Sequence, residues 1–269
     1  MVKLIASRLE GTFLDDTGQF DPVAFQRQLN VMQKRQIRFV VYSGLSYPEL
    51  LTKFQSVNGP IDYIAENGAQ VVQNGVNVAE HFVNPLVWDR ALRWLKKKSD
   101  FGKFKIILSA RSCSYTDLTP SDPQFKPLKQ LYPALTPVPN LGLVGDPVYQ
   151  VRLWVNQPNV NLLQQLFDQK FSRDLRAING GKHCLYIVNR GVNLSQGLQK
   201  LQAITKTRIR QTAAFGRVKR DFNLLNSAKD SYFVRNGAPE LANVAQPLKF
   251  TNNQRAVQKQ ITQILDTKE

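Results

Sequence analysis

Residue types that commonly carry catalysis are few in this chain, and their spacing argues against their usual uses. His81 and His183 lie far apart, and no cysteine or carboxylate accompanies either at the spacing of a zinc site. Cys113 and Cys184 show neither metal-ligand nor redox spacing, which indicates two reduced, buried thiols. The dipeptide Ser43-Gly44 lacks the Gly-x-Ser-x-Gly context of a nucleophile elbow. The sequence therefore favours none of these chemistries.

Charged and polar residues are better placed where they follow segments with the pattern of buried strands. The residues concerned are Arg8 and Glu10 after residues 2–6, Ser43 after residues 37–42, and Arg217, Arg220 and Asp221 after residues 208–215. What these residues can do depends on the elements that position them.

Strand-like and helical segments alternate through the first 72 residues. The predicted strands are residues 2–6, 37–42, 61–65 and 70–72, and the predicted helices are residues 22–35 and a segment that begins near Tyr47. Pro22 after Asp21 is a typical start of a helix. This alternation predicts βαβ units and a parallel sheet.

The middle of the chain has a different composition. It holds helical segments at 86–98 and 160–170, strand-like runs at 104–108, 148–155 and 184–188, and a proline-rich connection at 119–147 that predicts loops and irregular packing. The alternation then resumes, with helices predicted near 195–204, 221–228 and 252–266 and strands near 208–215 and 231–234. We therefore predict an α/β core, residues 1–82 and 190–269, interrupted by an inserted α+β domain, residues 83–189.

Six segments of the chain have motif-like sequences. They are Arg8–Leu14 after the strand Lys3–Ala6, Phe39–Glu49, Ile64–Ala69, Gly191–Leu194, Gly216–Leu225 and Asn236–Glu240. In order and spacing they resemble the signature regions of haloacid dehalogenase-like (HAD) phosphatases, specifically the Cof-type subgroup with an α/β cap inserted after the second motif. The resemblance covers nearly the whole chain. It implies a Rossmann-like core with a parallel sheet, a cap domain, and an active site at the carboxyl ends of the strands.

The resemblance also shows what this chain lacks. The family opens with Asp-x-Asp-Gly-Thr, in which the first aspartate attacks a phosphoryl group and the second acts as general acid and base. Arg8 stands at the nucleophile position, and a guanidinium is permanently protonated and has no lone pair to offer phosphorus. Glu10 keeps a carboxylate at the second position, one methylene longer. Leu194 replaces the lysine that follows the cap.

The magnesium site implied by the family is altered in the same way. In the fourth motif Arg217 and Arg220 replace an aspartate and an asparagine, and Asp221 alone matches a metal ligand. The six family positions carry a formal charge of −3, which one Mg²⁺ brings to −1, whereas the same positions here carry +1. We therefore expect no metal cofactor, although the family uses Mg²⁺.

Two interpretations of the arginines stay open. In the first, Arg8, Arg217 and Arg220 pair with Glu10 and Asp221, so that salt bridges replace the cohesion that a metal gives. In the second, the surplus positive charge binds a phosphate- or carboxylate-bearing small molecule without metal. The residues expected to assist such a ligand are Thr12, Ser43, Gly44 and Asn67.

The function predicted is therefore that of a catalytically inactive or very weak relative of sugar-phosphate phosphatases. A first alternative is an active phosphatase that uses Glu10 or Asp15 as nucleophile. A second alternative is a basic binding module for nucleic acid or an anionic surface, because 36 Lys and Arg against 20 Asp and Glu give a formal charge of +16. No nucleic-acid motif accompanies the charge, so we expect only weak, non-specific nucleic-acid binding.

The remaining predictions concern location and assembly. No run approaches the roughly 18 apolar residues of a membrane span, and the amino-terminal segment lacks a signal-peptide pattern. A cytoplasmic protein is therefore expected. The sequence leaves the oligomeric state open.

Overall fold

The computed structural model describes residues 1–98, 101, 104–155, 159–181 and 183–267. The chain divides into two compact units. Unit 1 is formed by Met1–Ala79 and Asn193–Glu269, and unit 2 is formed by Glu80–Val192. Each unit has its own sheet and its own apolar core.

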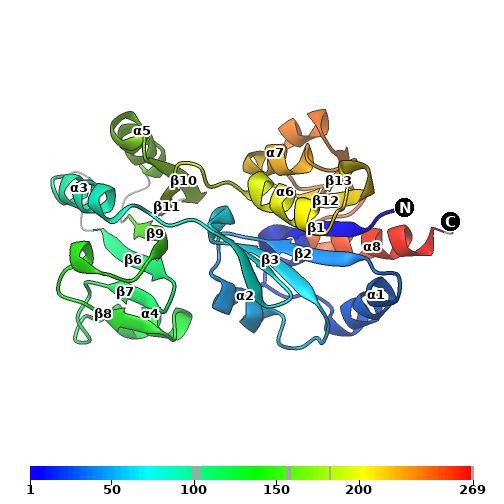
Figure 1. Cartoon of the computed structure of the whole chain (residues 1–269), viewed down its shortest axis with the longest axis horizontal. Helices are drawn as coiled ribbons and strands as arrows, with labels where there is room; N and C mark the ends of the chain where they lie inside the picture. Colours follow the sequence, from blue (N-terminus) through cyan, green and yellow to red (C-terminus); the bar gives the residue numbers. More distant parts are fainter. Residues whose placement is uncertain (99–100, 102–103, 156–158, 182, 268–269) are drawn as a thin grey trace. The chain divides into compact units, whose positions relative to one another are not determined.

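Unit 1 is built on a sheet with the strand order β14-β13-β12-β1-β2-β3-β4-β5 (Figure 1). The strands are β1 (Leu4–Arg8), β2 (Arg38–Tyr42), β3 (Ile61–Ala65), β4 (Gln70–Gln73), β5 (Val76–Glu80), β12 (Thr212–Gly216), β13 (Asp230–Phe233) and β14 (Gln246–Pro247). All pairs from β14 to β3 are parallel, and β4 runs antiparallel to β3.

Helices cover both faces of this sheet because its strands are apolar on both sides. Ile5 of β1 packs in a core with α1 (Pro22–Lys34), α2 (Tyr47–Lys53) and α8 (Ala256–Asp266). Leu4 and Ala6 point to the opposite face and pack with α6 (Leu194–Ile204) and α7 (Phe222–Leu225). Because successive side chains of a strand point to opposite faces, the apolar residues of β1 pack against both helical layers.

The order of the strands places a topological switch point at β1. The chain winds outward from β1 to β2 and β3, and later returns to place β12 on the other side of β1. Ligand sites of open α/β sheets lie outside the carboxyl ends of strands that flank such a point. Arg8 ends β1 and Gly216 ends β12, so the segments that follow these two residues meet there.

Unit 2 has a second sheet with the order β10-β11-β9-β6-β7-β8. The elements are α3 (Pro85–Lys96), β6 (Lys105–Ala110), β7 (Ser114–Thr116), α4 (Phe125–Leu131), β8 (Leu135–Pro137), β9 (Val148–Trp154), α5 (Val160–Phe171), β10 (Leu175–Gly181) and β11 (Cys184–Asn189). Ile106 and Leu108 pack in a cluster with α3 and α5, whereas Ile107 between them packs in a cluster with α4. Helices α3 and α5 lie on one side of this sheet and α4 on the other (Figure 1). The described pairs are antiparallel except β7 with β8.

The predicted α/β fold with a parallel sheet is confirmed, and several element predictions need correction. The proline-rich stretch 119–147 contains α4 and β8 as well as loops. The strand predicted at 208–215 begins only at Thr212, because residues 209–211 form a short 3₁₀ turn. Strands β5, β7, β10 and β14 were not predicted. Strand β7 has three residues and β14 has two, and β10 ends in Asn-Gly-Gly. These three strands therefore lack a clear apolar alternation.

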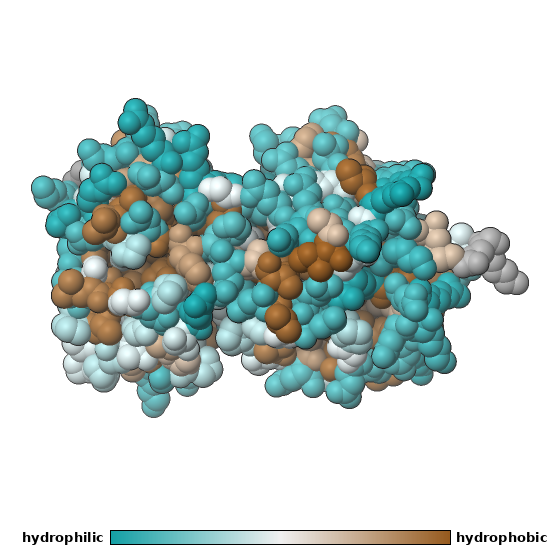
Figure 2. All heavy atoms as spheres, viewed as in Figure 1, coloured by the Kyte–Doolittle hydropathy of each residue, from teal (hydrophilic) through white to brown (hydrophobic). Residues whose placement is uncertain are grey.

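No helix among the described residues is long and apolar enough to cross a bilayer. Figure 2 shows hydrophilic residues over much of the visible face of both units, with smaller apolar areas between them.

Gly197 allows α6 to lie close to the sheet, and we expect Gly197→Ala to destabilise unit 1. A Cβ at this position would lie 2.6 Å from Cγ2 of the buried Ile64. Overpacking of this kind costs about 1–3 kcal/mol, whereas alanine gains about 1 kcal/mol in helix propensity. Urea denaturation should show a net loss of up to about 2 kcal/mol. Lys200→Ala on the exposed side of the same helix is the control, and an increased stability of Gly197→Ala would contradict the close-packing argument.

Candidate functional site

Arg8 occupies the carboxyl end of the central strand β1, next to Tyr42 at the end of β2. It is 4% exposed, and its Nη1 donates to Asp221 Oδ1 at 2.9 Å. Its Nη2 lies 3.8 Å from Glu10 Oε2. Burial by itself lowers the pKa of the guanidinium, but the attraction of the two carboxylates outweighs it and the pKa is raised. Arg8 is therefore a permanent cation held at the switch point.

Asp221 is buried and both of its carboxylate oxygens are occupied. It ends a short turn, Lys219–Asp221, that follows β12. Oδ1 accepts from Arg8, and Oδ2 accepts the backbone N–H groups of Arg217 at 2.9 Å and Val218 at 3.0 Å. The Asp221 carboxylate thus stabilises the loop in which it lies and links that loop to β1.

Arg217 takes a different partner from the one predicted. Its Nη1 donates to the carbonyl oxygen of Gly11 at 2.9 Å and pairs with Asp16 Oδ1 at 3.3 Å. Gly11 has φ +61°, and a Cβ there would lie 2.1 Å from Arg217 Nη1. Only glycine satisfies both conditions. Side-chain hydrogen bonds, first from Asn252 and then from Asn253, and Arg217 lower the pKa of Asp16, which stays charged.

Glu10 and Ser43 form a hydrogen-bonded pair between the turn after β1 and the end of β2. The Ser43 hydroxyl donates to Glu10 Oε1 and accepts from the N–H of Leu45 at 2.9 Å. Thr12 is buried, and its hydroxyl donates to the carbonyl oxygen of Glu10 at the long distance of 3.5 Å. Ser43 and Thr12 are thus engaged within the protein.

The other predicted positions lie at the same edge of the sheet. Asn67 has a positive φ of 57° and packs against Gly44, where a Cβ would lie 3.1 Å from Asn67 Nδ2. A Cβ at Gly68 would lie 2.5 Å from the carbonyl oxygen of Asn193, so this turn contacts the start of α6. Leu194 is 8% exposed and packs in the apolar cluster under α6. An apolar contact therefore replaces the family lysine.

Tyr42 belongs to this site although sequence reasoning treated it as an ordinary strand residue. It is fully buried, and its hydroxyl donates to the carbonyl oxygen of Phe215 at 2.8 Å. Burial and then the charge of Asp221 raise its pKa well above the usual value, while Arg8 and Arg220 act in the opposite direction. Its position as the last residue of a strand directly before Ser43 was the available signal.

The first interpretation of the arginines therefore holds for Arg8, which pairs with both predicted carboxylates. It was wrong for Arg217, whose guanidinium reaches Asp16 across 201 residues of sequence. Arg220 is half-buried and near enough to Tyr42 to affect its pKa. Counting Asp16 with Glu10 and Asp221, three carboxylates balance three arginines, and the surplus inferred from the six aligned positions disappears.

Comparison with known proteins agrees with the order of these motifs. The chain matches the haloacid dehalogenase-like hydrolase model over residues 5–261. The chain belongs to the haloacid dehalogenase-like hydrolase family. It is 25% identical over 265 residues to 5-amino-6-(5-phospho-D-ribitylamino)uracil phosphatase YbjI of Escherichia coli (strain K12), covering 98% of this chain and 96% of YbjI.

Solved structures of HAD-like proteins have the same fold. SMU.1108c from Streptococcus mutans UA159 superposes with a TM-score of 0.87 at 25% identity, covering 99% of this chain and 100% of that protein. TM0651 from Thermotoga maritima gives a TM-score of 0.82 at 17% identity, covering 100% of this chain and 99% of that protein. The predicted HAD resemblance is confirmed.

The HAD family implies a magnesium ion at this edge, and the residues of this chain do not fit one. Mg²⁺ requires near-octahedral oxygen ligands. Asp221 already binds a guanidinium and two N–H groups, and Glu10 accepts from Ser43. Within the described ranges no group of three or more His, Cys, Asp or Glu residues could hold a metal. The charged nitrogens of Arg8 lie where a cation would approach Asp221.

Arg8→Met should strongly destabilise unit 1. The substitution keeps an unbranched side chain but leaves Asp221 buried without its counter-charge, which costs about 3–5 kcal/mol for a buried pair. Adding Asp221→Asn should recover part of the loss, because the uncompensated charge is removed. Urea denaturation of the single and double variants measures both effects.

The control is Arg93→Gln, which breaks the exposed 2.7 Å pair with Asp89 and should cost about 0.5 kcal/mol or less. A loss below about 1 kcal/mol for Arg8→Met would show that the buried pair does not hold the edge together.

Proposed function

We propose that this HAD-like protein is catalytically silent or nearly so as a phosphatase, and that its former active-site edge is a structural ion-pair site. The observation that carries the proposal is the 2.9 Å contact between the buried Arg8 and Asp221. The group at the nucleophile position has no lone pair to offer phosphorus. The same group occupies the carboxylate on which a metal ion would depend.

The residues that remain do not supply a substitute nucleophile. Asp15 accepts from the Thr17 hydroxyl at 2.6 Å and from the N–H groups of Thr17 and Gln19 at 2.9 Å each, so it shapes the turn after Phe13. These hydrogen bonds lower its pKa and also reduce its nucleophilicity, because they stabilise the charged form. Glu10 is the better candidate, since its Oε2 has no hydrogen-bond partner. It is therefore the residue to test.

We further propose that unit 2 corresponds to the cap domain of the HAD family. It is inserted between Ala79 and Asn193, and its α+β composition agrees with this assignment. The substrate to test is then a phosphorylated small molecule of the kind that the name of YbjI gives.

The wild-type protein should turn over aryl phosphates, sugar phosphates and 5-amino-6-(5-phospho-D-ribitylamino)uracil at least about 1,000-fold more slowly than the roughly 1 s⁻¹ at the low end of typical enzymes. Phosphate release with Mg²⁺ present measures this rate, and YbjI assayed in parallel is the positive control. Activity that persists in Glu10→Gln is contamination. Turnover near 1 s⁻¹ that Glu10→Gln abolishes would refute the inactive assignment and favour the active-phosphatase alternative.

A variant with the family residues restored tests whether the backbone still holds the catalytic geometry. It combines Arg8→Asp, Glu10→Asp, Leu194→Lys, Arg217→Asp and Arg220→Asn. Some magnesium-dependent turnover should return, whereas Arg8→Asp alone should give none, since it leaves two arginines against the metal. Circular dichroism must show that each variant is folded.

Magnesium should not bind the wild-type site, because no free carboxylate oxygen pair faces it. Calorimetric titration of the wild type to millimolar Mg²⁺ should give no saturable heat. The variant with all five substitutions should give a measurable binding isotherm. Saturable binding to the wild type that Glu10→Gln removes would contradict the proposed charge arrangement.

A further inference from the structure

The amino ends of the core strands carry a second group of charges, at the edge of the sheet opposite Arg8. Lys3 precedes β1, Arg38 begins β2, and Lys229 precedes β13. Arg8 follows Lys3 by five residues of extended chain, so the two edges are separated by about 16 Å. This group is therefore independent of the ion-pair site.

The segment between α6 and β12 supplies the other charges. Lys206, Arg208 and Arg210 are exposed and lie on the loop that returns the chain to the sheet. The loop is fixed to its neighbours, because Lys3 N–H donates to Gln211 O at 2.7 Å and Lys229 N–H donates to Ile209 O at 3.1 Å. Residues separated by more than 200 positions are thereby brought to one edge.

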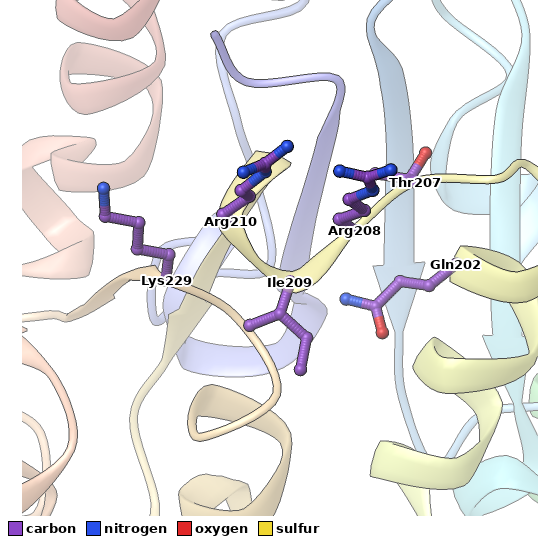
Figure 3. Close-up of a pocket in the computed structure, with 6 residues that line it drawn as sticks. All are labelled: Gln202, Thr207, Arg208, Ile209, Arg210 and Lys229. Atoms are coloured by element: carbon purple, nitrogen blue, oxygen red, sulfur yellow. The ribbon is translucent and has the colours of Figure 1, made fainter.

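Two shallow pockets lie at this edge and share Thr207. The first has a volume of about 690 Å³, and its lining includes Arg208, Arg210 and Lys229. The second has a volume of about 370 Å³, and its lining includes Lys3 and Lys206. In Figure 3 the side chains of Arg208, Arg210 and Lys229 extend the same way, whereas Ile209 points away from them.

The charges of this edge are not balanced. Arg38 is neutralised by Asp62, which it contacts at 2.7 and 2.8 Å. Asp230 is the carboxylate adjacent to Lys229 in sequence, and the six cations with Asp62 and Asp230 carry a net charge of +4. In the part of the chain that the structure describes, the cations other than Arg38 form no ion pair, namely Lys3, Lys206, Arg208, Arg210 and Lys229. Such a surplus attracts anions and repels itself when none is bound.

Three carbonyl groups in the last turn of α6 are hydrogen-bonded within the chain. The N–H groups of Thr205, Lys206 and Thr207 donate to the carbonyl oxygens of Leu201, Ala203 and Gln202, respectively. The amide of Gln202 is also engaged, with Thr212 Oγ1 at 3.0 Å and Ser227 O at 2.9 Å. The charged groups that line the two pockets are all basic side chains.

We propose that this edge, which we call the amino-edge site (Lys3, Lys206, Arg208, Arg210 and Lys229), binds a small ligand that carries several phosphate groups. The guanidinium groups of Arg208 and Arg210 suit bidentate contact with phosphate oxygens. The cations lie beside three neighbouring strands, β13, β12 and β1, a span of about 10 Å. One phosphate cannot contact all of them, whereas a chain of phosphates can.

The same observations disfavour nucleic acid as the ligand. Neither pocket is lined by an aromatic side chain on which a base could stack. Duplex DNA is therefore a competing ligand for the test.

Calorimetric titration of the full-length protein with tripolyphosphate tests the proposal. Wild type should show saturable binding that weakens as salt is raised, because exposed charges are screened. Arg208→Gln with Arg210→Gln should lower the affinity at least about tenfold, the loss of 1.4 kcal/mol or more. Both side chains are exposed, so the melting temperature without ligand should not change.

The matched control is Lys126→Gln with Lys170→Gln, which removes the same charge from exposed positions of unit 2. Its affinity should stay within about twofold of wild type. The proposal is overturned if wild type shows no saturable binding, if both double variants lose equally, or if a 20-base-pair duplex binds more tightly than tripolyphosphate. The test uses no catalytic readout, so its failure leaves the proposed function unaffected.

Discussion

A buried guanidinium–carboxylate pair links β1 to the loop after β12 at the carboxyl edge of the core sheet. Arg8 and Asp221 are separated by 213 residues, and each is at most 4% exposed. Removing two such ions from water costs several kcal/mol per ion, and the cost is offset only when geometry and hydrogen bonding are good. Here the 2.9 Å contact and the two N–H groups on the second oxygen meet that condition. The pair joins the two halves of the sheet where the winding reverses.

The same contacts decide what this edge cannot do. A carboxylate whose oxygens already accept a guanidinium and two N–H groups has little left to offer a cation. Close packing reinforces this, because the Arg217 guanidinium lies against the main chain of Gly11. The edge is thus filled by protein groups whose charges cancel. The chain has a HAD fold, and the charged groups at this edge are bound to one another.

The charge of the protein is distributed unevenly between the two edges of its core sheet. At the carboxyl ends, Arg8, Arg217 and Arg220 are buried or half-buried, and the three carboxylates of Glu10, Asp16 and Asp221 balance their charge. At the amino ends, the cations are mostly exposed and outnumber the carboxylates. The formal charge of +16 therefore has different consequences in different places. It stabilises the molecule where it is paired and is available to an outside anion where it is not.

The sequence by itself determined the family and the alternation of strands and helices in the core, and it predicted an arginine at the nucleophile position. These follow from local periodicity and from motif order, which one linear chain displays. Pairing of Arg8 with Asp221 was one of two interpretations that it left open, because both residues stand in recognisable motifs. The partner of Arg217, the hydroxyl contact of Tyr42 and the grouping of Lys3 with Arg208 and Lys229 were decided only by the tertiary structure. Each joins segments far apart along the chain, and side-chain reach in the folded core selects one partner among several of equal charge.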